Sequence, residues 1–148
     1  MGLDMYLTKK TYIGAEYEHR NVKGNIDITI DSKPVNINFN RVSYIQENVA
    51  YWRKANQIHK WFVDNVQDGE DDCKEYYVSK DSLKTLIKLC QKVLNKELDA
   101  ETNLPCKSGF FFGDVEYDEY YYDDLKDTIE QLTPLLEEEG DFYYSSSW

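Results

Sequence analysis

The sequence predicts a single α+β domain spanning residues 1–148, in which N-terminal antiparallel strands, including a hairpin, precede three main helices. A chain of 148 residues and 17.5 kDa is long enough for one hydrophobic core and too short for two. Apolar alternation with a period of two dominates the first third of the chain, whereas helical spacing dominates the rest. Strands therefore precede helices without βαβ alternation, and this order favours the α+β class.

Residues 1–47 are predicted to be mostly strands. Residues 3–8 and 12–17 are candidate strands because apolar and β-branched side chains recur in them. Residues 26–39 alternate most clearly and contain turn residues at 31–34, so we expect a hairpin there. One face of that hairpin should lie in the core and carry its isoleucines together with Val35, Ile37 and Phe39.

The first helix is predicted over residues 48–66. Asn48 is a candidate N-cap, because a side-chain oxygen at that position can accept a hydrogen bond from the first helical turn. Apolar side chains then recur at helical spacing and should form a stripe that faces the core. They are Tyr51, Ala55, Ile58, Phe62 and Val66.

Two further helices are predicted over residues 81–95 and 117–138. Ser79 or Asp81 is expected to cap the second helix. Pro134 lacks a backbone donor, so it should kink or restart the third helix. The buried stripe of the third helix is expected to be Tyr121, Leu125, Ile129, Leu132 and Leu136.

Three short segments complete the predicted fold. Residues 76–78 form a short strand or an extended lead-in to the second helix. Residues 109–113 place three phenylalanines between two glycines, which is too short for a helix and favours a buried strand, with Phe111 inside. Residues 141–144 are expected to add an edge strand or a packed tail.

The net charge of −11 comes entirely from the C-terminal quarter of the chain. Residues 1–113 carry 16 acidic and 16 basic side chains, whereas residues 114–148 carry 12 acidic side chains and one lysine. A sequence pI near 4.6 argues against direct binding to nucleic acids or to anionic membranes. The acidic segment is expected to serve solubility or assembly. A basic helical ridge is expected to be a solvated helix face, and the alternative is that it binds an anion or the acidic segment of the same or another subunit. That ridge is Lys80, Lys84, Lys88, Lys92 and Lys96.

Cysteine usage and the N-terminus both predict a cytoplasmic protein. The three cysteines are Cys73, Cys90 and Cys106, an odd number without the close pairs of a zinc knuckle. Cys90 falls within a helical apolar pattern and should be a buried thiol. The chain shows neither a signal peptide nor an apolar run that could cross a membrane.

No catalytic motif accompanies these features. The chain has two histidines, His19 and His59, in unrelated contexts, and it lacks phosphate-binding glycine loops, metalloprotease motifs and nucleophile elbows. We therefore expect no catalytic residues, no cofactor and no metal site. The sequence leaves enzymatic activity open but favours a non-enzymatic protein.

The strongest candidate site lies in the first predicted helix. On a helix, Trp52, Arg53, Asn56 and His59 would share one flank at the edge of the core. An indole can stack on a base, a guanidinium can bind phosphate, and an amide and an imidazole can read ring edges or ribose. The alternative is a set of ordinary core anchors, which we weigh about equally. Asp4 and Tyr6 are secondary candidates.

Three parts of the chain resemble small proteins encoded by bacteriophages and prophages. They are residues 1–7 (MGLDMYL), residues 49–62 (VAYWRKANQIHKWF), and residues 109–113 (GFFFG) together with 117–120 (YDEY). Some of these proteins carry an automatic phosphoglycerate kinase label. We reject it here, because the chain is too short for that two-domain enzyme and lacks its phosphate-binding glycines. The resemblance implies a phage accessory protein made in the bacterial cytoplasm, and such small acidic proteins often antagonise host immunity.

Three functions follow from the residues and the resemblance together. The leading hypothesis is a sponge, in which a homo-oligomer sequesters a small anionic nucleotide that signals infection. The second is an acidic inhibitor that binds a host defence protein such as a nuclease, in the manner of an anti-CRISPR protein or a DNA mimic. The third is an enzyme that degrades the same nucleotide signal, with His59 as its acid or base.

Overall fold

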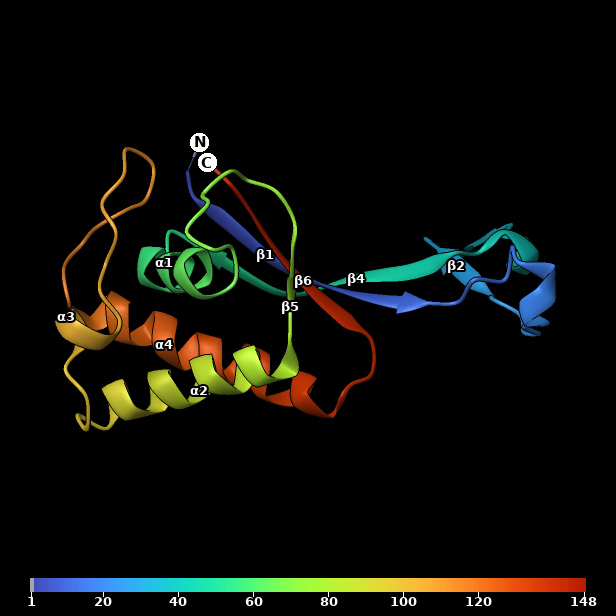
Figure 1. The fold of residues 1–148 in the computed structure, drawn as a ribbon. Helices are drawn as coiled ribbons and strands as arrows, with labels where there is room; N and C mark the ends of the chain where they lie inside the picture. Colours follow the sequence, from blue (N-terminus) through green and yellow to red (C-terminus); the bar gives the residue numbers. More distant parts are fainter. Residues whose placement is uncertain (1) are drawn as a thin grey trace.

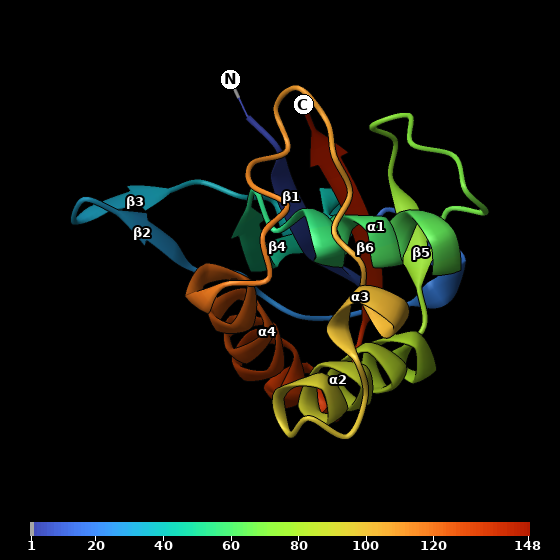
Figure 2. The ribbon, with the colours of Figure 1, turned by 90° about the vertical axis from the view of Figure 1, so that its left-hand side faces the viewer.

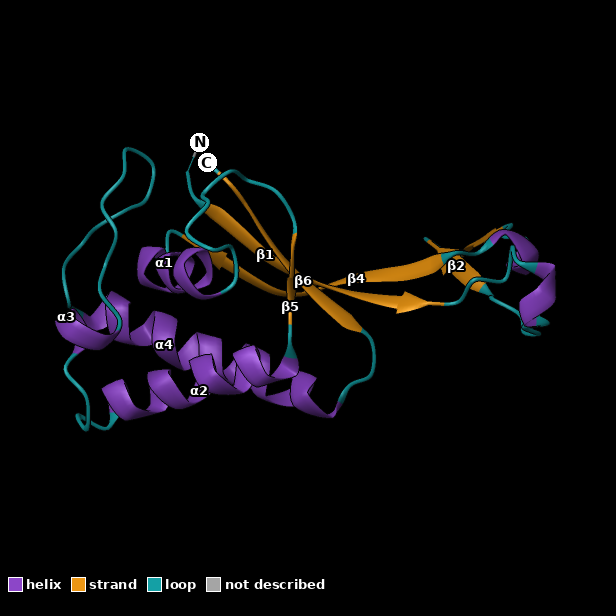
Figure 3. Ribbon diagram, viewed as in Figure 1, coloured by secondary structure: helices purple, strands orange, loops and turns teal. Residues whose placement is uncertain are grey.

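The computed structural model describes residues 2–148 and contains a four-stranded antiparallel sheet with helices packed on one face (Figure 1, Figure 3). The strand order is β4-β1-β6-β5, so the first and last strands of the chain lie side by side in the middle. The strands are β1 (Asp4–Tyr12), β4 (Tyr44–Arg53), β5 (Tyr76–Val78) and β6 (Asp141–Ser147). The predicted α+β class is confirmed.

In Figure 2, one helix crosses in front of the strands and the other helices lie below them. The main ones are α1 (Asn56–Asn65), α2 (Lys80–Leu94) and α4 (Glu119–Leu132), with the single turn α3 (Ala100–Asn103) after α2. A 3₁₀ turn, η3 (Thr133–Glu137), continues α4 and begins next to Pro134, as the missing backbone donor predicts. None of the helices in residues 2–148 has the length and apolar character needed to cross a membrane.

A projecting arm, residues 12–45, extends from the sheet beyond the end of β6 (Figure 1). The outer ends of β1 and β4 form its base. Its outer part holds a small hairpin of β2 (Ile28–Ile30) and β3 (Lys33–Val35) and two 3₁₀ turns, η1 (Glu18–Arg20) and η2 (Phe39–Arg41).

The core fills the space between the helices and the sheet. Trp52 on β4 is buried, and its Nε1 donates a hydrogen bond to Thr128 Oγ1 of α4 at 2.9 Å. Tyr144 on β6 stacks on Phe62 of α1, with ring centroids 3.9 Å apart. Aliphatic side chains from β1 and the helices complete this core, including Met5, Leu7, Ile58, Leu83, Leu86, Leu125 and Leu132.

The opposite face of the sheet carries tyrosines. Tyr6 and Tyr51 are directly paired in the β1–β4 register, with ring centroids 5.4 Å apart. Tyr77 and Tyr143 are paired across β5 and β6, with centroids 5.9 Å apart. Part of the high tyrosine content therefore covers a sheet face that the helices leave open.

The helix predicted over residues 48–66 is wrong in its first third. Residues 48–53 belong to β4, and α1 begins only at Asn56. The chain turns at Lys54, whose φ of 59° lies in the left-handed region and interrupts any helix. Pairing of β4 with β1 over its whole length overrides the helical apolar spacing, so Asn48 is a strand residue and no N-cap.

The predicted hairpin exists, but its apolar face is not in the core. Ile28, Ile30 and Val35 are all exposed, because the arm carries the hairpin away from the helices (Figure 1). Ile37 and Phe39 follow the hairpin and are half-buried. The second strand, β3, takes up residues 33–35, where a turn was expected at 31–34, and residues 36–39 are not in a strand. Alternation therefore predicts the hairpin but says nothing about which part of the molecule covers it.

Three shorter predictions also need correction or refinement. Residues 12–17 do not form a second strand: Tyr12 is the last residue of β1, and the chain turns after it. Residues 109–113 form a loop and turn instead of a buried strand, with Phe110 fully exposed and Phe112 buried. Residues 141–147 do form a strand, but it lies inside the sheet between β1 and β5.

The remaining helix predictions are confirmed. The Oγ atom of Ser79 caps α2 by accepting the backbone N–H of Ser82 at 3.1 Å. Burial raises the pKa of the Cys90 thiol to about 12, as expected for a core cysteine. The outer face of α2 presents its lysines to solvent, and Lys84 pairs within the helix with Asp81 at 3.9 Å.

Candidate functional site

The imidazole of His59 on α1 belongs to a network of polar contacts in the interior. Its side chain is fully buried. Nδ1 lies 2.8 Å from the Tyr144 hydroxyl of β6, and Nε2 lies 3.1 Å from the Asp71 carboxylate in the loop after α1. Both ring nitrogens are therefore engaged, and the ring joins three separate segments of the chain.

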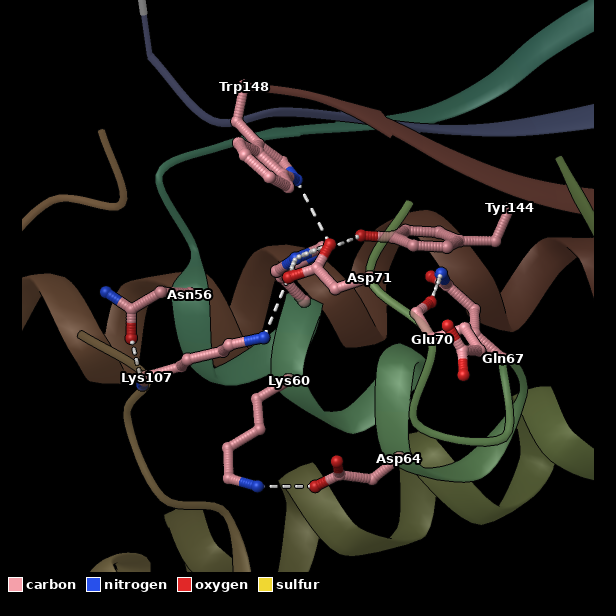
Figure 4. A network of polar contacts seen from close by, with 10 residues as sticks. Asn56, Lys60, Asp64, Gln67, Glu70, Asp71, Lys107, Tyr144 and Trp148 are labelled. Carbon is pink, nitrogen blue, oxygen red and sulfur yellow. Dashed lines mark hydrogen bonds and ion pairs between the residues drawn. The ribbon is translucent and has the colours of Figure 1, made fainter. Parts of the chain in front are cut away.

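Asp71 collects two further donors from distant parts of the chain (Figure 4). The Lys107 ammonium approaches it at 2.7 Å, and Nε1 of Trp148 donates to it at 3.0 Å. Burial alone would raise the pKa of Asp71, but its bonds to Lys107, His59 and Trp148 together hold that pKa below 3.8. Asp71 is consequently an anion with all its contacts supplied by the protein.

His59 is neutral in this setting. Burial lowers its pKa below 6.5, and this effect outweighs the attraction of Asp71. A neutral ring that donates from Nε2 to Asp71 and accepts the Tyr144 hydroxyl at Nδ1 satisfies every group in the chain of contacts. Burial also raises the pKa of Tyr144 well above 10.0, so its hydroxyl keeps its proton.

Asn56, at the start of α1, holds the loop of residues 104–118 against the helix. Its Nδ2 donates to the carbonyls of Phe112 at 3.1 Å and Asp114 at 2.7 Å. Its Oδ1 accepts the backbone N–H of Lys107 at 2.9 Å (Figure 4). Asn56 thereby fixes the two ends of the segment that presents the phenylalanines.

Gly113 makes the close approach between this loop and the start of α1 possible. Its φ of 88° is one that side-chain-bearing residues rarely adopt, and an added Cβ would lie 3.0 Å from Lys54 Cβ. The loop is therefore fixed by hydrogen bonds at Asn56 and by a tight backbone contact at Lys54.

A cavity of about 350 Å³ opens between this loop and the C-terminus. Asp71 and Lys107 supply its polar lining, and aromatic rings supply most of the rest. Phe110 is 94% exposed and Trp148 is 48% exposed, whereas Phe112 is buried against His59 with ring centroids 5.2 Å apart. The arrangement is a fixed polar floor with exposed aromatic walls.

The structure separates the four residues that sequence reasoning placed on one helical flank. Trp52 and Arg53 lie on β4, and as consecutive strand residues they face opposite sides of the sheet. The polar side-chain atoms of Trp52, Asn56 and His59 are all bound within the protein. Arg53 is the exposed member of the group.

Arg53 is brought next to the two secondary candidates, Asp4 and Tyr6. Asp4 pairs with Arg53 in the β1–β4 register, and the Tyr51 hydroxyl donates to the Asp4 carboxylate. Tyr6 packs its ring on Tyr51. These residues form part of the open sheet face and are distinct from the Asp71–Lys107 cavity.

Arg53 also lines a second cavity, of about 340 Å³, on the other side of the 104–118 loop. Burial raises the pKa of Asp124 in this cavity to about 6, and Gln57 Nε2 donates to its carboxylate at 3.0 Å. The lining has more acidic than basic groups, so it disfavours an anion. The acidic members are Asp114, Glu116, Asp118 and Asp124, and the basic ones are Arg53 and Lys54.

Sequence reasoning missed Asp71, Lys107, Phe110, Tyr144 and Trp148 as members of one cluster. These residues come from three separate parts of the chain, and the contacts of Tyr144 and Trp148 depend on the position of β6 beside β1. One signal was present, because three phenylalanines between two glycines fit an exposed loop as well as a buried strand.

Comparisons with protein-family models, curated proteins and solved structures yield no match to this chain. Within residues 2–148, no three His, Cys, Asp or Glu side chains converge in a way that could hold a metal ion.

Proposed function

We propose that the protein binds a small anionic ligand of the nucleotide class, without turnover, in the cavity between Lys107, Phe110, Phe112 and Trp148. The observation that carries the proposal is the pairing of exposed aromatic rings with an ammonium group in one cavity. This location replaces the helical flank suggested by the sequence, most of whose polar atoms are bound within the protein.

The aromatic walls favour a planar ring as the bound group. Stacking of a base on an aromatic side chain contributes about 1–3 kcal/mol, and every base offers a π-face. Trp148 and Phe110 keep a large part of their surface exposed to solvent, although Trp148 is anchored to Asp71 by its Nε1. An anchored ring loses little further freedom when a ligand stacks on it, which lowers the entropic cost of binding.

Lys107 supplies the positive group. The ammonium has three N–H donors, and one of them can bind the Asp71 carboxylate, whose Oδ2 lies 2.7 Å from Lys107 Nζ. Its backbone N–H is fixed on Asn56, so the side chain starts from a defined position at the edge of the cavity. The remaining donors can bind a phosphate or another anionic group of the ligand.

The same geometry supports binding over catalysis. A general base needs a free nitrogen within reach of the substrate, and both nitrogens of His59 are held inside the protein. The Asp71 carboxylate is occupied by His59, Lys107 and Trp148.

The resemblance to phage and prophage proteins supplies the biological setting of the proposal. A binding protein made in the bacterial cytoplasm during infection would lower the concentration of a nucleotide that activates a defence system. Sequestration requires affinity and protein abundance, and it needs no catalytic group.

Mass analysis of the ligand after release distinguishes the proposed functions. Purified protein is incubated with a panel of purine nucleotides, including cyclic dinucleotides, washed by gel filtration and then denatured by heat. A sponge releases at least one nucleotide with its mass unchanged. A changed mass indicates an enzyme, and the absence of any retained nucleotide contradicts the proposed ligand class.

An acidic inhibitor of a defence protein remains the second candidate because of one feature of α4. Its solvent side carries the carboxylates of Glu119, Asp127 and Glu130, while Lys126 is paired with Asp123 at 2.7 Å. Replacing Asp123 and Asp127 by lysine tests this function. Loss of anti-defence activity with unchanged nucleotide binding favours the inhibitor over the sponge.

A further inference from the structure

The projecting arm, residues 12–45, is folded without a core of its own. Among its residues, all of which the structure describes, Gly14 alone is buried. Its hairpin has two strands of three residues each. A two-stranded hairpin is marginally stable at best in water, because it buries too little apolar surface to offset the entropy of ordering.

The arm nevertheless exposes much of the apolar surface of the molecule. Seven of the thirteen large exposed hydrophobic side chains in the described residues belong to it. A groove of about 510 Å³ runs between the hairpin and the start of β4, lined mainly by apolar side chains. The seven exposed residues are Tyr12, Tyr17, Ile28, Ile30, Val35, Tyr44 and Ile45.

The arm carries both a groove and a side chain that can fill one. Ile28 and Ile45 line the groove, whereas Ile30 projects beyond it and is 59% exposed. In a two-fold contact the same surface meets itself, so that surface must contain both the groove and the side chain that enters it. The arm meets this requirement for a two-fold arrangement.

Charge favours the arm as the place where two copies meet. Residues 12–45 carry four acidic and four basic side chains and are formally neutral, so the net charge of −11 lies outside them. That charge lies in residues 114–148, so contacts between the acidic C-terminal quarters of two copies bring like charges together, which disfavours association there. Pairing through the arms buries the neutral surface, and the arms' projection keeps the acidic bodies apart (Figure 1).

We propose that the protein is a homodimer in which the arm of each copy packs on the arm of the other around a two-fold axis. This inference is independent of the ligand site and does not rest on the proposed nucleotide binding. The groove lined by Ile28 and Ile45 receives Ile30 of the partner copy.

Sedimentation velocity on single-residue variants tests the proposal. Ile30→Asp and Ile45→Asp each place a carboxylate in the apolar contact. Val115→Asp makes the same kind of change at an exposed aliphatic residue in the 104–118 loop, outside the arm, and serves as the matched control. Circular dichroism shows whether each variant retains the core, which contains no side chain of the arm.

The wild-type protein and Val115→Asp should sediment at twice the chain mass of 17.5 kDa. Each arm variant should raise the dimer dissociation constant by about 30-fold or more, as expected for a central apolar contact. A wild-type protein that is monomeric at about 100 µM, or arm variants that remain fully dimeric, overturns the proposal.

The salt dependence separates this dimer from one joined by the lysines of α2 and the acidic segment. Sodium sulfate should strengthen an apolar arm contact. A dimer that dissociates as sodium chloride rises depends on ion pairs and also overturns the proposal.

Discussion

At the scale of single residues, His59 illustrates how a buried polar side chain can hold distant segments of the chain together. Its ring connects α1, the loop after α1 and β6 through Asp71 and Tyr144. Buried polar groups are costly when unpaired, so each partner depends on the others. The network therefore fixes the positions of Lys107 and Trp148 at the cavity.

We expect the contribution of His59 to stability to fall as the pH drops below about 6.5, whereas Asp124, whose native pKa is raised to about 6, contributes in the opposite direction. Burial lowers the pKa of His59 in the folded protein, so the unfolded chain takes up the proton first and protonation favours unfolding. Asp71 adds a second loss at lower pH, because its native pKa lies below 3.8. Urea denaturation at a series of pH values measures both effects.

His59→Gln is the comparison for this pH series. The variant should be less stable than the wild-type protein at pH 7.5, and the difference in stability between the two proteins should shrink between pH 7 and pH 5. An unchanged slope across that interval would show that another group causes the pH dependence.

The phenylalanines of the 109–113 loop have opposite expected effects on stability. Phe112 is buried between His59 and Trp148, so Phe112→Ala should lower the free energy of unfolding by about 3–4 kcal/mol. Phe110 is 94% exposed, so Phe110→Ala should change it by less than about 0.5 kcal/mol. Thermal and urea denaturation of both variants checks the contrast, and equal losses would contradict the burial of Phe112.

At the scale of elements, β4 shows why sequence patterns predict some parts of the fold better than others. The helices α2 and α4 follow from their own apolar spacing, because they pack through one face of each helix. The segment before α1 has the same spacing, yet it pairs with β1 across 40 or more residues of chain. Such long-range pairing leaves little local signal.

The candidate site was harder to predict than the fold for the same reason. The side chains of Trp52, Asn56 and His59, expected to bind a ligand, each form a hydrogen bond to another part of the chain. Lys107 and Trp148 reach the site from distant loops. Only the tertiary arrangement brings them to Asp71.

The free edge of β4 is covered by one side chain of α4. Gln131 accepts the Tyr51 N–H at 2.8 Å and donates to the Tyr51 carbonyl at 3.1 Å, in place of a neighbouring strand. Such capping hinders pairing with another chain at this edge.

Gln131→Ala should lower the free energy of unfolding by about 1 kcal/mol, because both hydrogen bonds are exposed. It should also make the Tyr51 amide exchange rapidly with deuterium, as NMR can measure. Glu130→Ala, an exposed neighbour on α4, is the control and should leave that amide protected. Continued protection in Gln131→Ala would mean that another group covers the edge.

At the scale of the whole molecule, three surfaces have different characters. The arm is formally neutral and exposes several large apolar side chains, the outer sheet face is rich in tyrosine, and the C-terminal quarter carries the net negative charge. The Asp71–Lys107 cavity includes the C-terminal Trp148 in its lining, and the arm extends away from the two chain termini (Figure 1). Dimerisation through the arm therefore leaves both cavities of a dimer open to solvent.

Calorimetric titration of a nucleotide identified by the mass analysis into three proteins tests the central claim most directly. The proteins are the wild type, Lys107→Met and Arg53→Gln. Lys107→Met removes the ammonium group and keeps the aliphatic stem, so it should weaken binding by roughly 10- to 100-fold. Arg53→Gln should bind as the wild type does, because Arg53 lines the acidic cavity. Unchanged affinity in Lys107→Met, with binding lost in Arg53→Gln, would contradict the account and place the ligand beside Arg53.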